Sequence, residues 1–140
     1  MDLTLESFKV IWKNVEEGNS LTIITYGMGV HWAINAAKDF EGQIEIVDLR
    51  TIAPIDEATI FASVQKNSRC IVLTEEAINC SFAQSLAGRI QEACFTYLDA
   101  PVISMGAENT PAIPLNSELE KAYLPSAEKL KVKIEELLNF

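Results

Sequence analysis

The sequence predicts a three-layer α/β/α domain built on a mostly parallel sheet. Four short apolar segments with strand character, at 21–25, 44–49, 70–73 and 102–105, alternate with segments whose apolar residues recur at helical spacing. Repeated strand–helix–strand units pair in parallel through right-handed crossovers, so helices cover both faces of the sheet. With 140 residues, the chain has room for one domain with a single sizeable core.

The first half of the chain supplies the first strand–helix units. An exposed edge strand is expected at 8–12, where apolar residues alternate with lysines. A β-branched strand at 21–25 ends in a glycine turn and precedes a helix. The buried stripe of that helix consists of Val30, Ala33, Ile34 and Ala37. After the strand at 44–49, Asp56 is expected to cap the next helix.

The second half repeats the pattern and adds two helices. The segment 70–73 is wholly apolar, which is typical of a strand buried on both faces, and a helix at 81–94 and a strand at 102–105 follow it. A Ser-Glu-Leu-Glu capping box at 117–120 predicts a short helix. The last helix begins after Ser126, and its buried stripe consists of Leu130, Ile134, Leu137 and Leu138.

Composition and charge argue against several classes of function. The net charge is −9, from 20 acidic against 11 basic residues, so the chain should repel the phosphates of nucleic acids and anionic lipid surfaces. No apolar run reaches the roughly 18 residues that a membrane span needs, and the acidic amino-terminal segment does not resemble a secretory signal. We therefore expect a protein of the cytoplasm or of an organelle matrix that is not secreted.

Cysteine and histidine usage argues against a metal centre. Cys70, Cys80 and Cys94 are an odd number without CxxC spacing, and each lies in an apolar context, so reduced thiols are expected. His31 is the single histidine. It could carry a proton or contact an anion, but a structural or interface role is the favoured interpretation.

Two short motifs could carry chemistry. Gly27 and Gly29 lie between a strand and a helix, where backbone N–H groups could hold an anion. Trp32 occupies the third glycine position of the dinucleotide fingerprint, so a tight turn is favoured over a phosphate cradle. Glu75 and Glu76 leave a strand as adjacent residues and point to opposite faces, so they cannot share a proton as a catalytic pair. These patterns alone do not define a complete active site.

Five segments resemble, in the same order, parts of the carboxy-terminal domain of the transketolase family. The closest likeness is to the β subunit of thiamine-dependent 2-oxo acid dehydrogenases. The segments are 21–31 (LTIITYGMGVH), 47–56 (VDLRTIAPID), 76–77 (EA), 97–102 (YLDAPV) and 119–125 (LEKAYLP). We expect residues 17–140 to form this domain, with residues 1–16 as a linker and edge strand.

The resemblance implies a five-stranded mixed sheet in the order 1-3-2-4-5, with the first strand antiparallel. That order places the strands at 21–25 and 70–73 side by side, with a crevice at their carboxyl ends. A contact between the histidine and one of the two adjacent carboxylates is expected there. The residues expected at this switch point, as an interface, are Tyr26, Gly27, Gly29, His31, Glu75 and Glu76.

The resemblance also implies an activity for a parent enzyme. Such an enzyme oxidatively decarboxylates a 2-oxo acid, for example pyruvate or a branched-chain acid, and passes the acyl group to lipoamide. Thiamine diphosphate and its magnesium ion bind between two other domains of these enzymes. We therefore expect no cofactor, metal ligand or catalytic residue in this chain and no activity of the isolated domain, whose role would be assembly.

The expected partners are the other domains and subunits of the dehydrogenase, in a homo- or hetero-oligomer, and the dihydrolipoyl acyltransferase core. The last helix should leave carboxylates outward at its negative end, close to the end of the chain. The possible docking residues for a basic acyltransferase segment are therefore Glu135, Glu136 and Phe140. An equally weighted interpretation is that nearby lysines neutralise this helix and its end frays.

Two departures from the dehydrogenase pattern keep alternatives open. Glu75 stands where the dehydrogenases have a histidine, and the glycine pair expected after it is missing around 80–82. A carboxylate pair is also similar to deoxyxylulose-phosphate synthases, so the same domain of such a synthase or of a transketolase is one alternative. A stand-alone flavodoxin-like protein that binds an anion or nucleotide is another. The segments at 97–102 and 119–125 favour the dehydrogenase.

Overall fold

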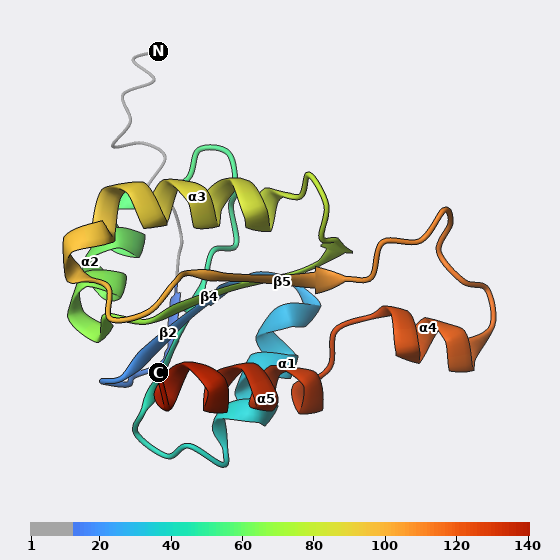
Figure 1. Cartoon of the computed structure of the whole chain (residues 1–140), viewed down its shortest axis with the longest axis horizontal. Helices are drawn as coiled ribbons and strands as arrows, with labels where there is room; N and C mark the ends of the chain where they lie inside the picture. Colours follow the sequence, from blue (N-terminus) through green and yellow to red (C-terminus); the bar gives the residue numbers. More distant parts are fainter. Residues whose placement is uncertain (1–12) are drawn as a thin grey trace.

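The computed structural model describes residues 13–140 and forms a five-stranded sheet with helices on both faces (Figure 1). The strand order is β1-β3-β2-β4-β5, with β1 antiparallel to β3 and the other pairs parallel. The predicted architecture, order and strand directions are confirmed. The strands are β1 (Lys13–Glu16), β2 (Leu21–Thr25), β3 (Ile44–Asp48), β4 (Cys70–Ala77) and β5 (Ile103–Ala107). The edge strand predicted at 8–12 lies outside the described residues.

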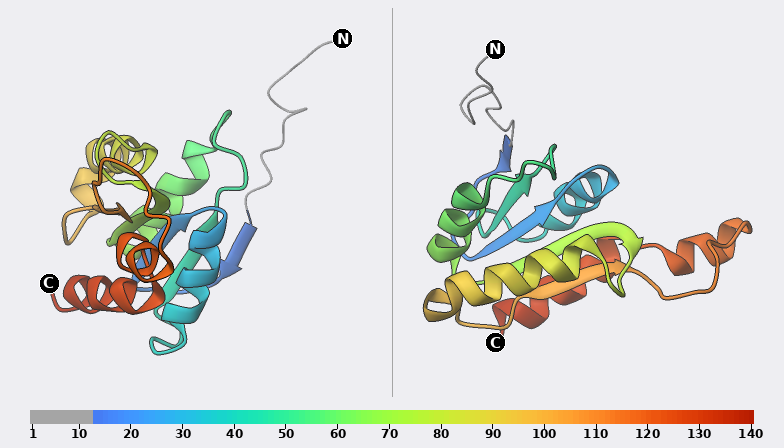
Figure 2. Two further views of the ribbon diagram at one scale, coloured as in Figure 1. Left: turned by 90° about the vertical axis from the view of Figure 1, so that its right-hand side faces the viewer. Right: turned by 90° about the horizontal axis from the view of Figure 1, so that it is seen from above.

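The helices form the two outer layers. They are α1 (Met28–Ala37), α2 (Glu57–Asn67), α3 (Phe82–Cys94), α4 (Ser117–Tyr123) and α5 (Ala127–Leu138), with a 3₁₀ turn η2 (Phe95–Tyr97) after α3. The α1 and α5 helices pack on one face of the sheet, and α2 and α3 pack on the other (Figure 2). The short α4 stands away from the sheet, in an arm formed by residues 108–124 (Figure 1). No helix in residues 13–140 is long and apolar enough to cross a membrane.

Two apolar cores fill the space between the sheet and the helices. Both exist because the central strands β2 and β3 and the first part of β4 are buried on both faces. The core beneath α1 and α5 includes Leu21, Ile23, Ile46, Leu73, Leu130 and Ile134. The core beneath α2 and α3 includes Ile24, Val47, Ile60, Val72, Leu86 and Ile90. Each such side chain contributes about 1.5–3 kcal/mol on burial, so the two cores hold the layers together.

A buried polar network joins α2 to the amino ends of β2 and β3. The Ser63 hydroxyl donates to Oε1 of Glu45 at 3.0 Å. The side-chain amide of Asn67 donates to Oε2 of Glu45 and to Oγ1 of Thr22, each at 2.9 Å. Lys66 forms an ion pair with the same carboxylate from the protein surface. Because burying a carboxylate is costly unless its oxygens are paired, this network allows Glu45 to lie inside the domain.

Side-chain caps determine where the helices begin. The Asp56 side chain accepts a hydrogen bond from the Thr59 N–H at 3.1 Å, so the predicted cap of α2 is confirmed. The start of α4 differs from the prediction, because Asn116 and not Ser117 is its N-cap. The Asn116 side chain accepts from two backbone N–H groups of the first turn. Asparagine is among the strongest N-cap residues, and it takes the place that the capping box assigned to serine.

The strands β4 and β5 extend beyond their predicted ends. Strand β4 continues past the apolar segment through Glu75 and Glu76, and its pairing with β5 resumes at Ala77 after an irregularity in register. Strand β5 covers Ile103–Ala107, where 102–105 was predicted. The apolar pattern marked the buried part of β4, whereas pairing with β5 resumes at Ala77, beyond the exposed Glu75 and Glu76.

Candidate functional site

The two segments expected at the crevice lie together at the carboxyl ends of β2 and β4. Tyr26 follows β2 directly, and Phe82 begins α3 after the loop that leaves β4. Their rings pack edge to face, with centroids 6.0 Å apart and planes inclined at 73°. The connections from β2 to β3 and from β3 to β4 run to opposite sides of β2, so this place is the topological switch point of the sheet.

The glycine turn is explained by the fold. Gly27 precedes α1 with a φ of 59°, in the left-handed region that glycine adopts without strain. Gly29 lies against β2, where a Cβ atom would collide with the hydroxyl of Thr25. These requirements support the tight-turn interpretation of the motif. The carboxylates of Glu75 and Glu76 are close enough to influence Tyr26 electrostatically, and they disfavour a second anion at the turn.

The two adjacent glutamates have different roles. Oε1 of Glu76 accepts a hydrogen bond from the Phe82 N–H at 2.8 Å, at the start of α3. The helix dipole also stabilises a negative charge at this end of the helix. The Glu75 carboxylate has no hydrogen bond or ion pair with another described residue. Both side chains line a shallow pocket of ≈ 540 Å³ that the arm closes from the other side with Tyr123 and Leu124. One carboxylate supports the fold, and the other is available to a partner.

Tyr26 is electrostatically coupled to Glu75 and Glu76. Partial burial raises the pKa of its phenol above the ordinary value, and the charges of Glu76 and then Glu75 raise the pKa further. The phenol therefore keeps its proton at neutral pH and remains a hydrogen-bond donor at the crevice.

His31 does not make the expected contact. It lies on the exposed side of α1 and forms no ion pair with Glu75 or Glu76 within residues 13–140. His31 lies about one helical turn after the start of α1. Because the helix runs away from the strand ends, the His31 side chain is displaced from the crevice. An interface role for His31 stays a prediction.

The described residues do not form a metal site. No group of three or more His, Cys, Asp or Glu side chains in residues 13–140 is arranged to hold a metal ion. Cys70 and Cys94 are buried free thiols, and burial raises the pKa of the Cys70 thiol. Cys80 is also a free thiol but is exposed in the loop before α3, so its predicted apolar environment is wrong. The nearest apolar residues in the sequence, Ile78 and Phe82, are half-buried, while the Cys80 side chain faces solvent.

The carboxy-terminal residues expected to dock a partner are exposed but partly neutralised. Glu136 pairs with Lys133 at 2.7 Å, and the side-chain amide of Asn139 donates to the carbonyl of Glu135 at 2.8 Å. Phe140 is 73% exposed and lies beside a second shallow pocket near the start of β5. An apolar ring next to exposed carboxylates is therefore presented at the end of α5.

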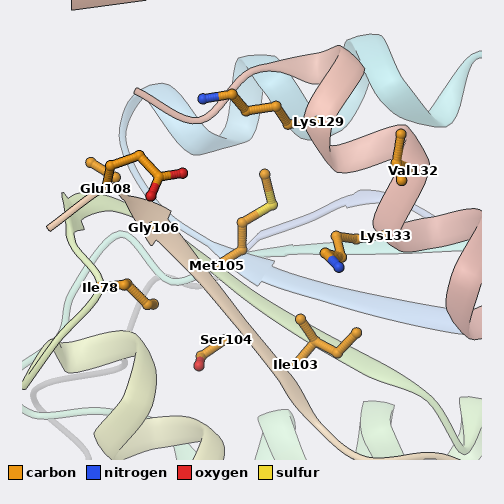
Figure 3. Close-up of a pocket in the computed structure, with 10 residues that line it drawn as sticks. Ile78, Ile103, Ser104, Met105, Gly106, Glu108, Lys129, Val132 and Lys133 are labelled. Atoms are coloured by element: carbon orange, nitrogen blue, oxygen red, sulfur yellow. The ribbon is translucent and has the colours of Figure 1, made fainter. Parts of the chain in front are cut away.

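Two surface features were not anticipated from the sequence. A groove of ≈ 480 Å³ lies between β5 and α5, with Met105, Val132 and Lys133 among its lining residues (Figure 3). The arm exposes three large apolar side chains, Ile113, Leu115 and Leu119. The signal for the groove was an uncharged strand, Ile-Ser-Met-Gly-Ala, followed by a proline-rich segment that leaves the sheet without pairing again.

Curated relatives cover most of this chain. The chain is 38% identical over 126 residues to the β subunit of 3-methyl-2-oxobutanoate dehydrogenase from Mycobacterium tuberculosis, covering 87% of this chain and 36% of that subunit. It is 37% identical over 112 residues to the β subunit of the pyruvate dehydrogenase E1 component from Rhizobium meliloti, covering 78% of this chain and 24% of that subunit. The matched part of the chain thus spans between about a quarter and little more than a third of the length of these relatives.

Solved structures and family models agree with this similarity. A split-gene transketolase in an inactive β4 tetramer superposes with a TM-score of 0.74 at 20% identity, covering 91% of this chain and 42% of that one, which shows the shared fold. The family model for the transketolase C-terminal domain matches residues 11–130. Because this match includes most of the chain, the protein belongs to the transketolase C-terminal domain family.

Proposed function

We propose that this chain is the assembly and docking domain of the β subunit, or of the β part of a fused chain, in a 2-oxo acid dehydrogenase complex. The parent enzyme would oxidatively decarboxylate pyruvate or a branched-chain 2-oxo acid and pass the acyl group to lipoamide. The observation that carries this proposal is the 38% identity, over 87% of the chain, to a branched-chain dehydrogenase β subunit. A location in the cytoplasm or an organelle matrix accords with that role.

The site geometry supports an assembly role for the domain. Thiamine diphosphate supplies the decarboxylation chemistry when it is bound in the parent enzyme. The residues of this chain do not fit it, because the glycine turn at Gly27 borders two carboxylates and no metal-binding cluster is formed within residues 13–140. The crevice instead offers a phenol donor, an unpaired carboxylate and two packed aromatic rings. Such a mixture suits a contact with a neighbouring domain.

The same domain of a deoxyxylulose-phosphate synthase or a transketolase is less well supported. The split-gene transketolase shares 20% identity with this chain, against 38% for the dehydrogenase β subunit. The five-strand order with an antiparallel first strand is also unlike a stand-alone flavodoxin-like protein, whose sheet is wholly parallel.

The cofactor part of the proposal is tested by isothermal titration of this chain with thiamine diphosphate and magnesium. We expect no binding heat, because no group of three or more His, Cys, Asp or Glu side chains among residues 13–140 is arranged to hold the metal ion. One-to-one binding with micromolar affinity would contradict a purely assembling role. A matched titration of a complete dehydrogenase β and α pair provides the positive control.

Docking of the acyltransferase involves the end of α5 in this proposal. The side chains of Glu135, Glu136 and Phe140 are all exposed in the last turn of α5 and the residues that follow it. A peripheral-subunit-binding domain rich in lysine and arginine is complementary to that surface, and its attraction should weaken as salt screens the charges.

Charge neutralisation tests the docking surface. The variant Glu135→Gln/Glu136→Gln should weaken binding of such a domain about tenfold at low salt. The control Glu16→Gln/Glu17→Gln changes the net charge equally, at the β1 edge of the sheet, and should leave binding within about threefold. Surface plasmon resonance measures both affinities. Equal losses in the two variants would show that overall charge, and not this surface, attracts the partner.

A further inference from the structure

The arm is tied to the domain by few hydrogen bonds, all at its base. Its two ends meet where the Glu108 N–H donates to the carbonyl of Tyr123 at 3.0 Å. Among the described residues, three hydrogen bonds join the arm to the rest of the domain. One runs from the Asn79 N–H to the side chain of Asn109 at 3.1 Å, and the other two come from Lys129. A single side chain of α5 thus supplies most of this attachment.

Lys129 binds the carboxyl end of α4. Its ammonium donates to the carbonyl of Ala122 at 2.6 Å and to that of Leu124 at 2.8 Å. Lys129 lies in the first turn of α5, and its side chain points away from Val132 of the same helix (Figure 3). The last carbonyls of a helix lack partners inside it and form the negative end of its dipole, so a cation is stabilised there. One side chain therefore caps α4 and ties it to α5.

Helix α4 is too short to be stable without such contacts. It has seven residues, and isolated helices shorter than about 12–15 residues are marginal in water. Apolar packing adds little, because Leu119 is 60% exposed and Tyr123 is the one buried residue of the helix. Asn116 caps the amino end from within the arm, whereas the cap of the carboxyl end comes from Lys129, outside the arm. The folded state of α4 thus depends on its contact with α5.

Charge opposes the present position of the arm. The pocket of ≈ 540 Å³ at the end of β4 has Glu75 and Glu76 on the strand side and Glu120 on the arm side, and none of its lining residues is basic. Glu120 has no ion pair with another described residue, because the neighbouring Lys121 pairs with Glu118. Like charges across one pocket repel each other. The attachment at the base of the arm must therefore outweigh this repulsion.

The chain can bend at both ends of the arm. Pro125 follows α4 directly, and because proline cannot continue a helix, α4 and α5 are separate rigid elements. At the other end, Glu108 follows Ala107, the last residue of β5 that pairs with β4. Hinges are usually a few residues at the ends of such elements. Rotation at these two places moves the arm without disturbing the sheet (Figure 1).

We propose that Lys129 is a latch, which holds the arm closed against the end of β4 and whose release opens the arm and unfolds α4. Lys129 is thus a positioning residue for the arm. Because the arm exposes Ile113, Leu115 and Leu119, the latch determines where these apolar side chains are presented. The inference goes beyond acyltransferase docking at the end of α5 and does not depend on it.

The first test compares Lys129→Met with Lys121→Met in this chain. Methionine keeps the apolar stem but donates no hydrogen bond, so hydrogen exchange of the α4 amides and of the Leu124 amide should become about tenfold faster in Lys129→Met. Lys121→Met changes the net charge equally, on the arm itself, and should stay within about threefold of the original rate. Unchanged exchange at Val72 in β4 shows that the domain remains folded. Equal α4 exchange in the two variants would overturn the proposal.

The second test removes part of the opposing charge. Glu75→Gln neutralises a carboxylate on the β4 side of the pocket without changing the arm, so the arm should open less often and the α4 amides should exchange about threefold more slowly. Glu16→Gln makes the same change in net charge on β1, at an outer edge of the sheet, and should leave this exchange unaltered. Equal exchange in Glu75→Gln and Glu16→Gln would overturn a closure that charge opposes.

The third test is rescue by Lys129→Arg. A guanidinium keeps the charge and can donate to both carbonyls, so α4 exchange should remain within about threefold of the original rate. Exchange as fast as in Lys129→Met would overturn the latch. All three tests use this chain alone, so their failure leaves acyltransferase docking at α5 intact. Unchanged docking in the Glu135→Gln/Glu136→Gln variant would overturn the docking role and leave the latch intact.

Discussion

Polar residues at the two ends of the central strands differ in burial and in how many partners they have within the domain. At the amino ends, Glu45 and Asn67 are buried, and the two carboxylate oxygens are paired within the domain. At the carboxyl ends, Glu75 and Glu76 are exposed, and one hydrogen bond to the start of α3 ties the pair to the fold. The contrast teaches that surroundings, more than charge, determine whether a carboxylate stabilises a domain or is available to a partner.

The largest effect should come from breaking the buried network. Asn67→Ala removes the donor to both Glu45 and Thr22 and leaves a buried carboxylate short of one partner. We expect the free energy of unfolding to fall by about 3 kcal/mol. Urea denaturation measures the change. The control Asn79→Ala, at an exposed loop position, should cost below about 0.5 kcal/mol, and a similar loss in both would remove the distinction between the two ends.

A smaller effect should separate the two crevice glutamates. Glu76→Ala deletes the acceptor of the Phe82 N–H and should lower the free energy of unfolding by about 1 kcal/mol, as loss of a helix cap does. Glu75→Ala, one residue away on the same strand, should change it by less than about 0.5 kcal/mol. Parallel denaturation curves decide the comparison. Equal costs would mean that both carboxylates support the fold.

The smallest effect concerns the ionisation of Tyr26. Its folded-state pKa is raised, so the stability linked to it is fully present below the unfolded pKa near 10 and is lost as pH rises through the folded pKa. The Glu75→Gln/Glu76→Gln variant should lower the pKa of Tyr26 only in part, because burial is the larger cause. Difference absorbance spectra against Tyr26→Phe follow the phenolate. A complete return to the ordinary value would show that charge dominates at this crevice.

Local patterns predicted the elements well where one principle dominated. The bounds of β2 agree residue for residue, because its β-branched residues are all buried, and Asp56 caps α2 because its neighbours offer no stronger acceptor. The strand order and the switch point followed from the family resemblance. Periodicity alone gives the number of strands but not their arrangement, since several parallel orders bury the same faces.

The site was predicted less completely than the fold. The strand order implied by the family resemblance placed Tyr26 and the Glu75–Glu76 pair at one crevice. It did not distinguish Glu76, which accepts from the Phe82 N–H at the start of α3, from its unpaired neighbour Glu75. The expected contact of His31 with these carboxylates is not formed. The direction of a side chain at the start of a helix depends on how that helix crosses the sheet, which no local pattern records.

The sequence by itself determined the class of fold, because apolar spacing dictates which faces of each strand and helix must be buried. Only the tertiary structure decided that Glu45, inside an apolar strand, is satisfied by Ser63 and Asn67 from α2, and that β5 keeps an open edge. The physical reason is that burial periodicity is a local property of the chain. Hydrogen-bond satisfaction and edge exposure depend instead on which distant segments become neighbours.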